Sequence, residues 1–192
     1  MVWNYLDYSN YLFVIDLYFL LMVNGKQSNQ FMAYKLLFVC LGNICRSPSA
    51  ENIMNHLILQ SGLTERIICD SAGTSGYHIG NSPDQRMSAT AIRKLGFPLV
   101  GKARQFQISD FQEFNLILAM DLDNYKNILS LNPTGGEHKH KVHLICDFCS
   151  QYKLKEVPDP YYGDYEGFDQ VIDLLVDGCR GLLEYILSQG LI

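Results

Sequence analysis

One ten-residue segment places a cysteine and an arginine at a spacing that suits phosphate chemistry. It reads Val39-Cys40-Leu41-Gly42-Asn43-Ile44-Cys45-Arg46-Ser47-Pro48 and joins an apolar run to the start of a helical pattern. Six successive backbone N–H groups, with the positive end of the helix, would hold a phosphate dianion: those of Leu41, Gly42, Asn43, Ile44, Cys45 and Arg46. The Arg46 side chain would add a planar, two-pronged donor. The same field would favour the thiolate of Cys40, which could attack phosphorus and form a phosphocysteine.

A thiolate that displaces an ester oxygen also needs an acid to protonate the leaving group. The best candidate is Asp159, in Val157-Pro158-Asp159-Pro160-Tyr161-Tyr162-Gly163, because two prolines stiffen the loop around it. The same carboxylate would then activate water. Taken alone, Asp159 also fits an ordinary turn and Cys40 a buried structural thiol. The glycine, the preceding strand and the proline-started helix agree with one another, which favours the catalytic interpretation.

The elements that must position these residues alternate short apolar runs with helical patterns. This alternation predicts βαβ units and a parallel sheet. Strands are expected at residues 35–39, 66–69, 115–119 and 142–145, and helices from about 48 to 62, 87 to 95 and 167 to 188. Residues 71–84 read as a loop. Side-chain caps are expected at three helix starts: Ser47, Ser109 (in a capping box with Gln112) and Asp121.

Composition describes one folded domain with an unusual beginning. The chain has 192 residues, of which 48% are hydrophobic and 18% charged, so it is too apolar to be disordered. The apolar run 11–23 contains Asp16 and is too short to span a membrane, and no basic residue precedes it. We assign residues 1–31 to an extension outside the fold, which an upstream start codon would explain, and 32–192 to the domain. The other interpretation of the extension is a membrane-surface anchor, although it lacks a basic face.

Charge and cysteine content exclude several classes of protein. The net charge of −5 argues against a general nucleic-acid surface. Six cysteines are too few for a disulfide scaffold. A histidine- and cysteine-rich run looks like a metal cluster: His138, His140, His143, Cys146 and Cys149. Alternation along the expected strand would turn these side chains to opposite faces, so we expect no metal and no cofactor.

Taken together, the motifs resemble those of the low-molecular-weight protein tyrosine phosphatases. The similarity covers about Ala33 to Leu187, and the matching segments follow the family's order: 40–51, 70–84, 103–105, 119–121 and 159–163. The resemblance implies an α/β three-layer sandwich, in which a twisted four-stranded parallel sheet has helices on both faces. It implies Cys40 as nucleophile, Arg46 as phosphate clamp, and Asp159 as general acid and then base.

The resemblance also implies supporting residues. Three match a hydrogen-bond network that holds the phosphate loop and the thiolate: Asn43, Ser47 and Ser71. Three match the walls of the substrate cleft: Tyr77, Tyr161 and Tyr162. Cys45 matches a second loop cysteine that forms a reversible disulfide with the nucleophile, although a small packed side chain explains it equally well. Many relatives carry a histidine where this chain has Gly101-Lys102, so we expect the rigidity of the phosphate loop to differ.

The expected activity is hydrolysis of phosphotyrosine in a protein or peptide, in the cytoplasm, by a monomer or weak dimer. The apolar Ile44 favours aryl esters, because relatives that resemble phosphoarginine phosphatases carry threonine there. Arsenate reductases share the fold and the loop, so arsenate reduction or a thiol redox switch through Cys40 and Cys45 is the alternative. No cysteine lies between Cys69 and Cys146, where many such reductases place an electron relay.

Overall fold

A computed structural model describes residues 32–132, 136–161, 163 and 165–192. Its elements follow in this order: β1 (Tyr34–Cys40), α2 (Arg46–Gln60), β2 (Ile67–Gly73), α3 (Gln85–Leu95), α4 (Asp110–Glu113), β3 (Leu116–Ala119), α5 (Leu122–Ser130), η1 (Lys139–Lys141), β4 (Val142–Leu144), η2 (Ile145–Phe148) and α6 (Tyr165–Ser188). Residues Ala33–Ile192 form one compact unit, to which all of these elements belong. The predicted extension, residues 1–31, lies outside the described residues.

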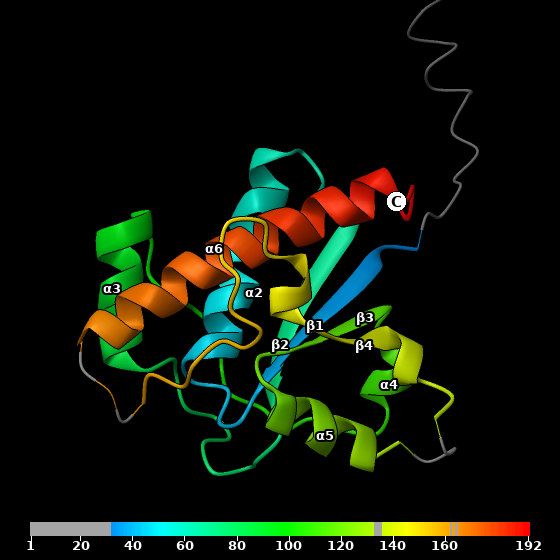
Figure 1. Cartoon of the computed structure of the whole chain (residues 1–192), viewed down its shortest axis with the longest axis horizontal. Coiled ribbons are helices and arrows are strands. Elements are labelled where there is room, and N and C mark those ends of the chain that lie inside the picture. Colours follow the sequence, from blue (N-terminus) through cyan, green and yellow to red (C-terminus); the bar gives the residue numbers. More distant parts are fainter. Residues whose placement is uncertain (1–31, 133–135, 162, 164) are drawn as a thin grey trace, which may run out of the picture. The chain divides into compact units, whose positions relative to one another are not determined.

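The four strands form one parallel sheet in the order β2-β1-β3-β4 (Figure 1). The chain passes from β1 to β2 on one side and then returns to place β3 and β4 on the other. Because the winding changes direction between β1 and β3, the crevice at their carboxyl ends is where such sheets bind ligands. Val39 pairs with both Ala72 of β2 and Ala119 of β3, so β1 is a central strand. Its last residue, Cys40, therefore lies in the middle of the sheet's carboxyl edge.

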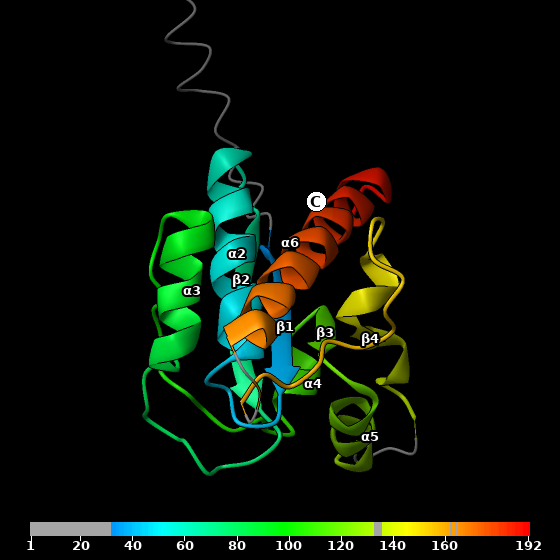
Figure 2. The same ribbon diagram turned by 60° about the vertical axis from the view of Figure 1, so that its left-hand side comes forward.

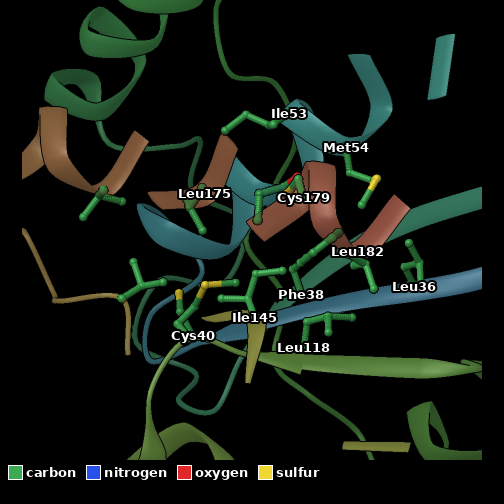
Figure 3. Packing of buried hydrophobic residues seen from close by; sticks show 14 of the residues in the cluster. Leu36, Phe38, Cys40, Ile53, Met54, Leu118, Ile145, Leu175, Cys179 and Leu182 are labelled. Atoms are coloured by element: carbon green, nitrogen blue, oxygen red, sulfur yellow. The ribbon is translucent and has the colours of Figure 1, made fainter. Parts of the chain in front are cut away.

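Helices cover both faces of this sheet, as Figure 2 shows: α2, α3 and α6 on one side, α4 and α5 on the other. Alternate residues of β1 point into the two layers, as the pleat of a strand requires. Leu36 and Phe38 pack toward α2 and α6 in the cluster drawn in Figure 3, whereas Leu37 packs toward Phe111 and Ile128. The predicted three-layer sandwich is therefore confirmed.

Two glycines allow α6 to lie directly on η2. A Cβ at Gly181 would come within 1.9 Å of the Phe148 carbonyl oxygen, and one at Gly178 within 3.0 Å of Ile145 Cγ1. No side chain fits at the first position without moving backbone. This close approach anchors the start of the segment that runs from η2 toward Asp159.

A buried carboxylate of α6 holds the next residues of that segment. Asp177 accepts hydrogen bonds from the N–H groups of Ser150 (3.3 Å), Gln151 (2.9 Å) and Tyr152 (3.0 Å), and from the Ser150 hydroxyl (3.0 Å). Burial opposes the charge, but these hydrogen bonds outweigh it and hold the pKa of Asp177 below its usual value. The segment is thus tied to α6 by its backbone.

Two of the expected caps are absent and one is present. The prediction for Ser47 is wrong, because α2 begins at Arg46, two residues before Pro48, and the Ser47 hydroxyl contacts the Cys40 sulfur at 3.1 Å instead. Ser109 also makes no capping hydrogen bond, so the expected capping box is absent. Asp121 does cap α5, since its Oδ1 accepts the N–H of Asn124 at 2.6 Å.

The expected loop 71–84 is wrong in its first three residues. β2 continues to Gly73, and Ser71 pairs with Phe38 of β1. Small and polar side chains here carry no strand pattern, but β1 supplies the backbone partners. The extension matters for the site, because it sets the Ser71 hydroxyl beside the loop that follows β1.

Candidate active site

A cavity of about 150 Å³ lies at the carboxyl end of β1. It is lined by Cys40, Leu41, Gly42, Ile44, Cys45, Arg46, Ser75, Tyr77, His78, Asp159 and Tyr161. The structure thus brings the expected nucleophile, clamp and acid into one space, although Arg46 and Asp159 are 113 residues apart in the chain. Five of the six expected phosphate-binding residues line it, and the sixth, Asn43, is buried and does not line it.

The Cys40 sulfur receives two polar contacts within the loop. The N–H of Asn43 donates to it over 3.2 Å, and the Ser47 hydroxyl lies 3.1 Å away. Ser47 Oγ accepts from Asn43 Nδ2 at 2.9 Å, and its own hydrogen can point either at the sulfur or at the Ala72 carbonyl, which lies 3.3 Å away. Cys40 is only 3% exposed, so these contacts are made in a largely dry place. They orient the thiol toward the cavity.

Asn43 connects the loop to two neighbouring segments. Its Nδ2 donates to the hydroxyls of Ser47 and Ser71, each at 2.9 Å, and its Oδ1 accepts the N–H of Arg104 at 2.8 Å. Its φ of 55° lies in the left-handed region, which asparagine tolerates better than most residues. The fully used amide fixes this conformation. The three residues expected to form a network, Asn43, Ser47 and Ser71, therefore lie in contact.

The network ends at a carboxyl group that the sequence analysis did not assign. The Ser71 hydroxyl donates to Glu51 Oε2 at 2.6 Å. Burial raises the pKa of Glu51, against the opposing effect of that hydrogen bond. A signal for its position was available, because Glu51 follows Ser47 by four residues and so shares its face of α2.

Arg46 is held by three oxygens. Nη1 donates to Asp121 Oδ2 at 2.6 Å and to the Val157 carbonyl at 3.1 Å, and Nη2 donates to Asp159 Oδ2 at 2.6 Å. Its side chain is 3% exposed. Burial lowers the pKa of Arg46, but the negative charges of Cys40, Asp159 and Asp121 outweigh it and raise the pKa above its usual value. A fixed cation thus lies close to Cys40, the expected nucleophile.

Asp121 was expected only as a helix cap, and its contact with Arg46 was missed. The signal lay in the topology: Asp121 follows β3, which pairs with β1 in the sheet. The carboxyl ends of neighbouring parallel strands meet at one edge. A polar residue just after β3 is therefore well placed to reach a side chain just after β1.

Aromatic side chains form the outer walls. Tyr77 is 85% exposed and Tyr161 is 37% exposed, and both line the cavity. His78, which sequence reasoning missed, also lines the cavity, with its ring centroid 6.3 Å from that of Tyr161. Tyr162 lies outside the described residues. The described walls suit a flat aromatic group above the phosphate loop.

Arg86 braces the loop that carries the acid, a role that sequence reasoning missed. Its guanidinium donates to Asp84 Oδ2 at 2.8 Å and to the Tyr161 carbonyl at 3.2 Å. It also lies over the rings of Tyr161, at 5.4 Å, and Phe168, at 4.9 Å. The start of α3 is thereby joined to the loop that follows Asp159.

The remaining cysteines are free thiols. Burial, together with the nearby Asp84 carboxylate, raises the pKa of Cys45 far above its usual value, so Cys45 stays protonated beside the nucleophile. In the histidine- and cysteine-rich run, His143 Nε2 lies 3.0 Å from the His140 carbonyl, and Cys149 donates to the Leu174 carbonyl at 3.8 Å. Within the described ranges, no group of three or more His, Cys, Asp or Glu residues could hold a metal ion. Nor is any described helix long and apolar enough to cross a membrane.

Comparison with known proteins assigns the family. Residues 35–190 match the profile of the low molecular weight phosphotyrosine protein phosphatases. The chain belongs to this family. One relative is slr0328 from Synechocystis, whose name assigns it provisionally to the low molecular weight protein-tyrosine-phosphatases. The two chains are 61% identical over 149 residues, which cover 78% of this chain and 94% of that protein. The human low molecular weight phosphotyrosine protein phosphatase is 40% identical and covers 78% of this chain and 93% of its own.

Solved structures of family members agree. A protein tyrosine phosphatase from Entamoeba histolytica, crystallised with Hepes in its active site, superposes with a TM-score of 0.77 at 46% identity. The match covers 83% of this chain and all of that one. YfkJ from Bacillus subtilis gives a TM-score of 0.75 at 37% identity, over 86% of this chain and 99% of its own. The expected family and enzyme class, a low-molecular-weight protein tyrosine phosphatase, are therefore confirmed.

Proposed function

We propose that this phosphatase hydrolyses phosphotyrosine in proteins or peptides through a phosphocysteine on Cys40. One observation carries the proposal: a sulfur with two polar contacts, a buried guanidinium and a carboxyl group converge in a single cavity with aromatic walls. The apolar side chain of Ile44 in that cavity supports an aryl ester as the substrate. No cofactor takes part in the proposed chemistry.

In the first step, the Cys40 thiolate attacks phosphorus on the side opposite the tyrosine oxygen. The S–P bond forms, the P–O bond to the ring breaks, and Asp159 gives its proton to the leaving oxygen. Arg46 and the N–H groups of residues 41–46 receive the phosphoryl oxygens. The Ser47 hydroxyl and the Asn43 N–H stabilise the thiolate before attack.

The ion pair between Arg46 and Asp159 gives the acid a defined starting position. A phosphate dianion brings oxygens that compete with Asp159 Oδ2 for the same Nη2. The displaced carboxyl group is then free to take a proton and reach the leaving oxygen. Asp121 and the Val157 carbonyl keep hold of Nη1 meanwhile, so the guanidinium stays in place.

In the second step, water completes the hydrolysis. The Asp159 carboxylate takes a proton from a water molecule, whose oxygen attacks phosphorus. The P–S bond breaks, inorganic phosphate leaves, and the Cys40 thiolate is restored. Each turnover consumes one water and releases one phosphate and one tyrosine hydroxyl.

Substitution of the nucleophile and the acid tests this mechanism. We expect Cys40→Ser to abolish hydrolysis of an aryl phosphate, and acid-quenched wild-type protein to carry phosphate on Cys40. We expect Asp159→Asn to slow turnover by about 10²–10⁴-fold, most strongly with poor leaving groups, because it cannot donate a proton. Cys69→Ser and Asp123→Asn, which lie outside the cavity, are the matched controls. Full turnover by Cys40→Ser, or an inactive wild type, would refute the proposal.

The same experiment includes the alternative chemistry. Arsenate with a thiol reductant is assayed beside phosphotyrosine peptide and phosphoarginine. Arsenate-dependent thiol oxidation with negligible aryl phosphatase activity would favour a reductase or a Cys40–Cys45 redox switch.

We further propose a cytoplasmic location and a monomer or weak dimer, with free thiols at all six cysteines supporting a reducing compartment.

A further inference from the structure

A second hollow, of about 520 Å³, opens beside the catalytic cavity. We call it the flanking groove. Its walls are the loop 80–85, Lys102 and three residues that also line the catalytic cavity: Ile44, His78 and Tyr161. The two spaces therefore share part of their walls, and a peptide with its phosphotyrosine in the first would hold its neighbouring residues close to the second.

Backbone hydrogen bonds hold the flanking groove in a fixed shape. Gly80 N–H donates to the Ala103 carbonyl and Ala103 N–H to the Asn81 carbonyl, both at 2.8 Å. Asp84 N–H donates to the Ile44 carbonyl at 2.7 Å. The first two bonds join the loop 80–85 to the segment that carries Lys102, and the third bond joins the same loop to the phosphate loop. A preformed groove of this kind binds a peptide without first ordering its own walls.

The charges in the groove are unequal. The Asp84 carboxylate already has partners within the protein. It pairs with the Arg86 guanidinium at 2.8 Å and caps α3 by accepting the Arg86 N–H. Lys102 Nζ donates to the Ser82 hydroxyl at 3.0 Å, and no carboxylate among the described residues pairs with it. One ammonium group is thus left to meet a ligand, next to a hydroxyl that can accept or donate.

We propose that the flanking groove binds the peptide residues next to phosphotyrosine and that Lys102 selects an acidic side chain there. The inference rests on the proposed function of the neighbouring site and names its substrate class: phosphotyrosine with a flanking Asp or Glu. Ser82 would fix the ammonium group and offer a second hydrogen bond to the carboxylate. Because the contact is exposed to solvent, its effect is modest and weakens with salt.

Matched peptides test the groove. Phosphotyrosine peptides that differ only in having Glu, Gln or Lys beside the phosphotyrosine, on either side, are compared by kcat/KM. We expect Glu peptides to exceed Gln peptides by roughly 2–5-fold, the range of an exposed ion pair, and Lys peptides to be the poorest. Lys102→Met should remove this order and leave hydrolysis of a small aryl phosphate unchanged. Lys126→Met, on the exposed surface of α5, should keep it.

Several outcomes would overturn the inference. Equal kcat/KM for all peptides, or an order that survives in Lys102→Met, excludes selection by Lys102. A parallel loss with the small aryl phosphate shows that Lys102 acts on the catalytic loop instead. Peptide binding to Cys40→Ser, measured without turnover, separates the two proposals: an acidic preference in binding supports the groove even if the wild type is inactive. Hydrolysis of aryl phosphate without that preference refutes the groove alone.

Discussion

At the scale of single residues, Asn43 makes several of the contacts that hold the site together. It bonds to the loop that it belongs to, to β2 through Ser71, and to the segment at Arg104. The same residue donates its backbone N–H to the nucleophile. Buried amides with all partners present rigidify their surroundings, whereas a missing partner is costly. The shape of the phosphate loop therefore depends on this one side chain.

Removing that amide should harm both folding and turnover. We expect Asn43→Ala to lower the free energy of unfolding by about 1–3 kcal/mol and kcat by about ten-fold or more, since buried groups of Ser71 and Arg104 lose their partner. Denaturant unfolding and steady-state kinetics measure the two effects. Asn43→Gly, which accepts the same positive φ, should lose activity too, whereas the exposed Asn55→Ala should not. Full activity in the glycine variant would show that only the backbone conformation matters.

Sequence reasoning reached the residues whose position follows from strand ends and missed those set by loop contacts. Cys40 and Arg46 could be placed because a parallel sheet presents its ligands at the carboxyl ends of its strands. His78 and Arg86 depend on how the loop 74–84 folds back over the site, and no spacing encodes that path. The cap predicted for Ser47 is absent because α2 begins at Arg46, which puts Ser47 inside the helix; its hydroxyl instead contacts the Cys40 sulfur, as expected of the network that the resemblance implies.

At the scale of elements, buried strands were predictable and their ends were not. β1 and β3 are apolar throughout because parallel strands are covered on both faces, which produces a continuous hydrophobic run. The last residues of β2 are polar or small, so only pairing with β1 shows that they are strand. α6 was recognisable from its apolar stripe, but the contact of Gly181 with Phe148 depends on tertiary packing.

Asp177 should make the stability of the fold sensitive to acid. Its pKa is lowered in the folded state, so its contribution is fully present above the unfolded value of about 3.9 and is lost as pH falls through the lower native value. We expect Asp177→Asn to reduce the melting temperature near neutral pH and to flatten its decline below about pH 4. Thermal unfolding across pH measures this, with the exposed Asp123→Asn as control. If the melting temperatures of wild type and Asp177→Asn fell in the same way below about pH 4, the prediction would be contradicted.

At the scale of the whole molecule, the described part of the chain builds its core and its cavity from residues after Met32. The described elements run from Tyr34 to Ser188, and the cavity is lined by residues between Cys40 and Tyr161. We expect a chain that begins at Met32 to keep the kcat/KM and melting temperature of the full chain. Aryl phosphate kinetics and calorimetry test this, and a clear loss of either would give residues 1–31 a part in the fold. Sedimentation with lipid vesicles by the full chain alone would favour a surface anchor.

Asp121 couples the phosphate site to a helix that does not line it. One carboxylate oxygen receives Arg46 and the other receives the first turn of α5. An oxyanion that shares the positive charge of Arg46 weakens the attraction between Nη1 and Asp121 without breaking their contact, and therefore alters how firmly α5 is capped. By thermodynamic reciprocity, the fraying of α5 alters oxyanion affinity. Amide exchange at Asn124 then reports on occupancy of a cavity on the other side of the guanidinium, and α5 becomes a remote sensor of bound phosphate.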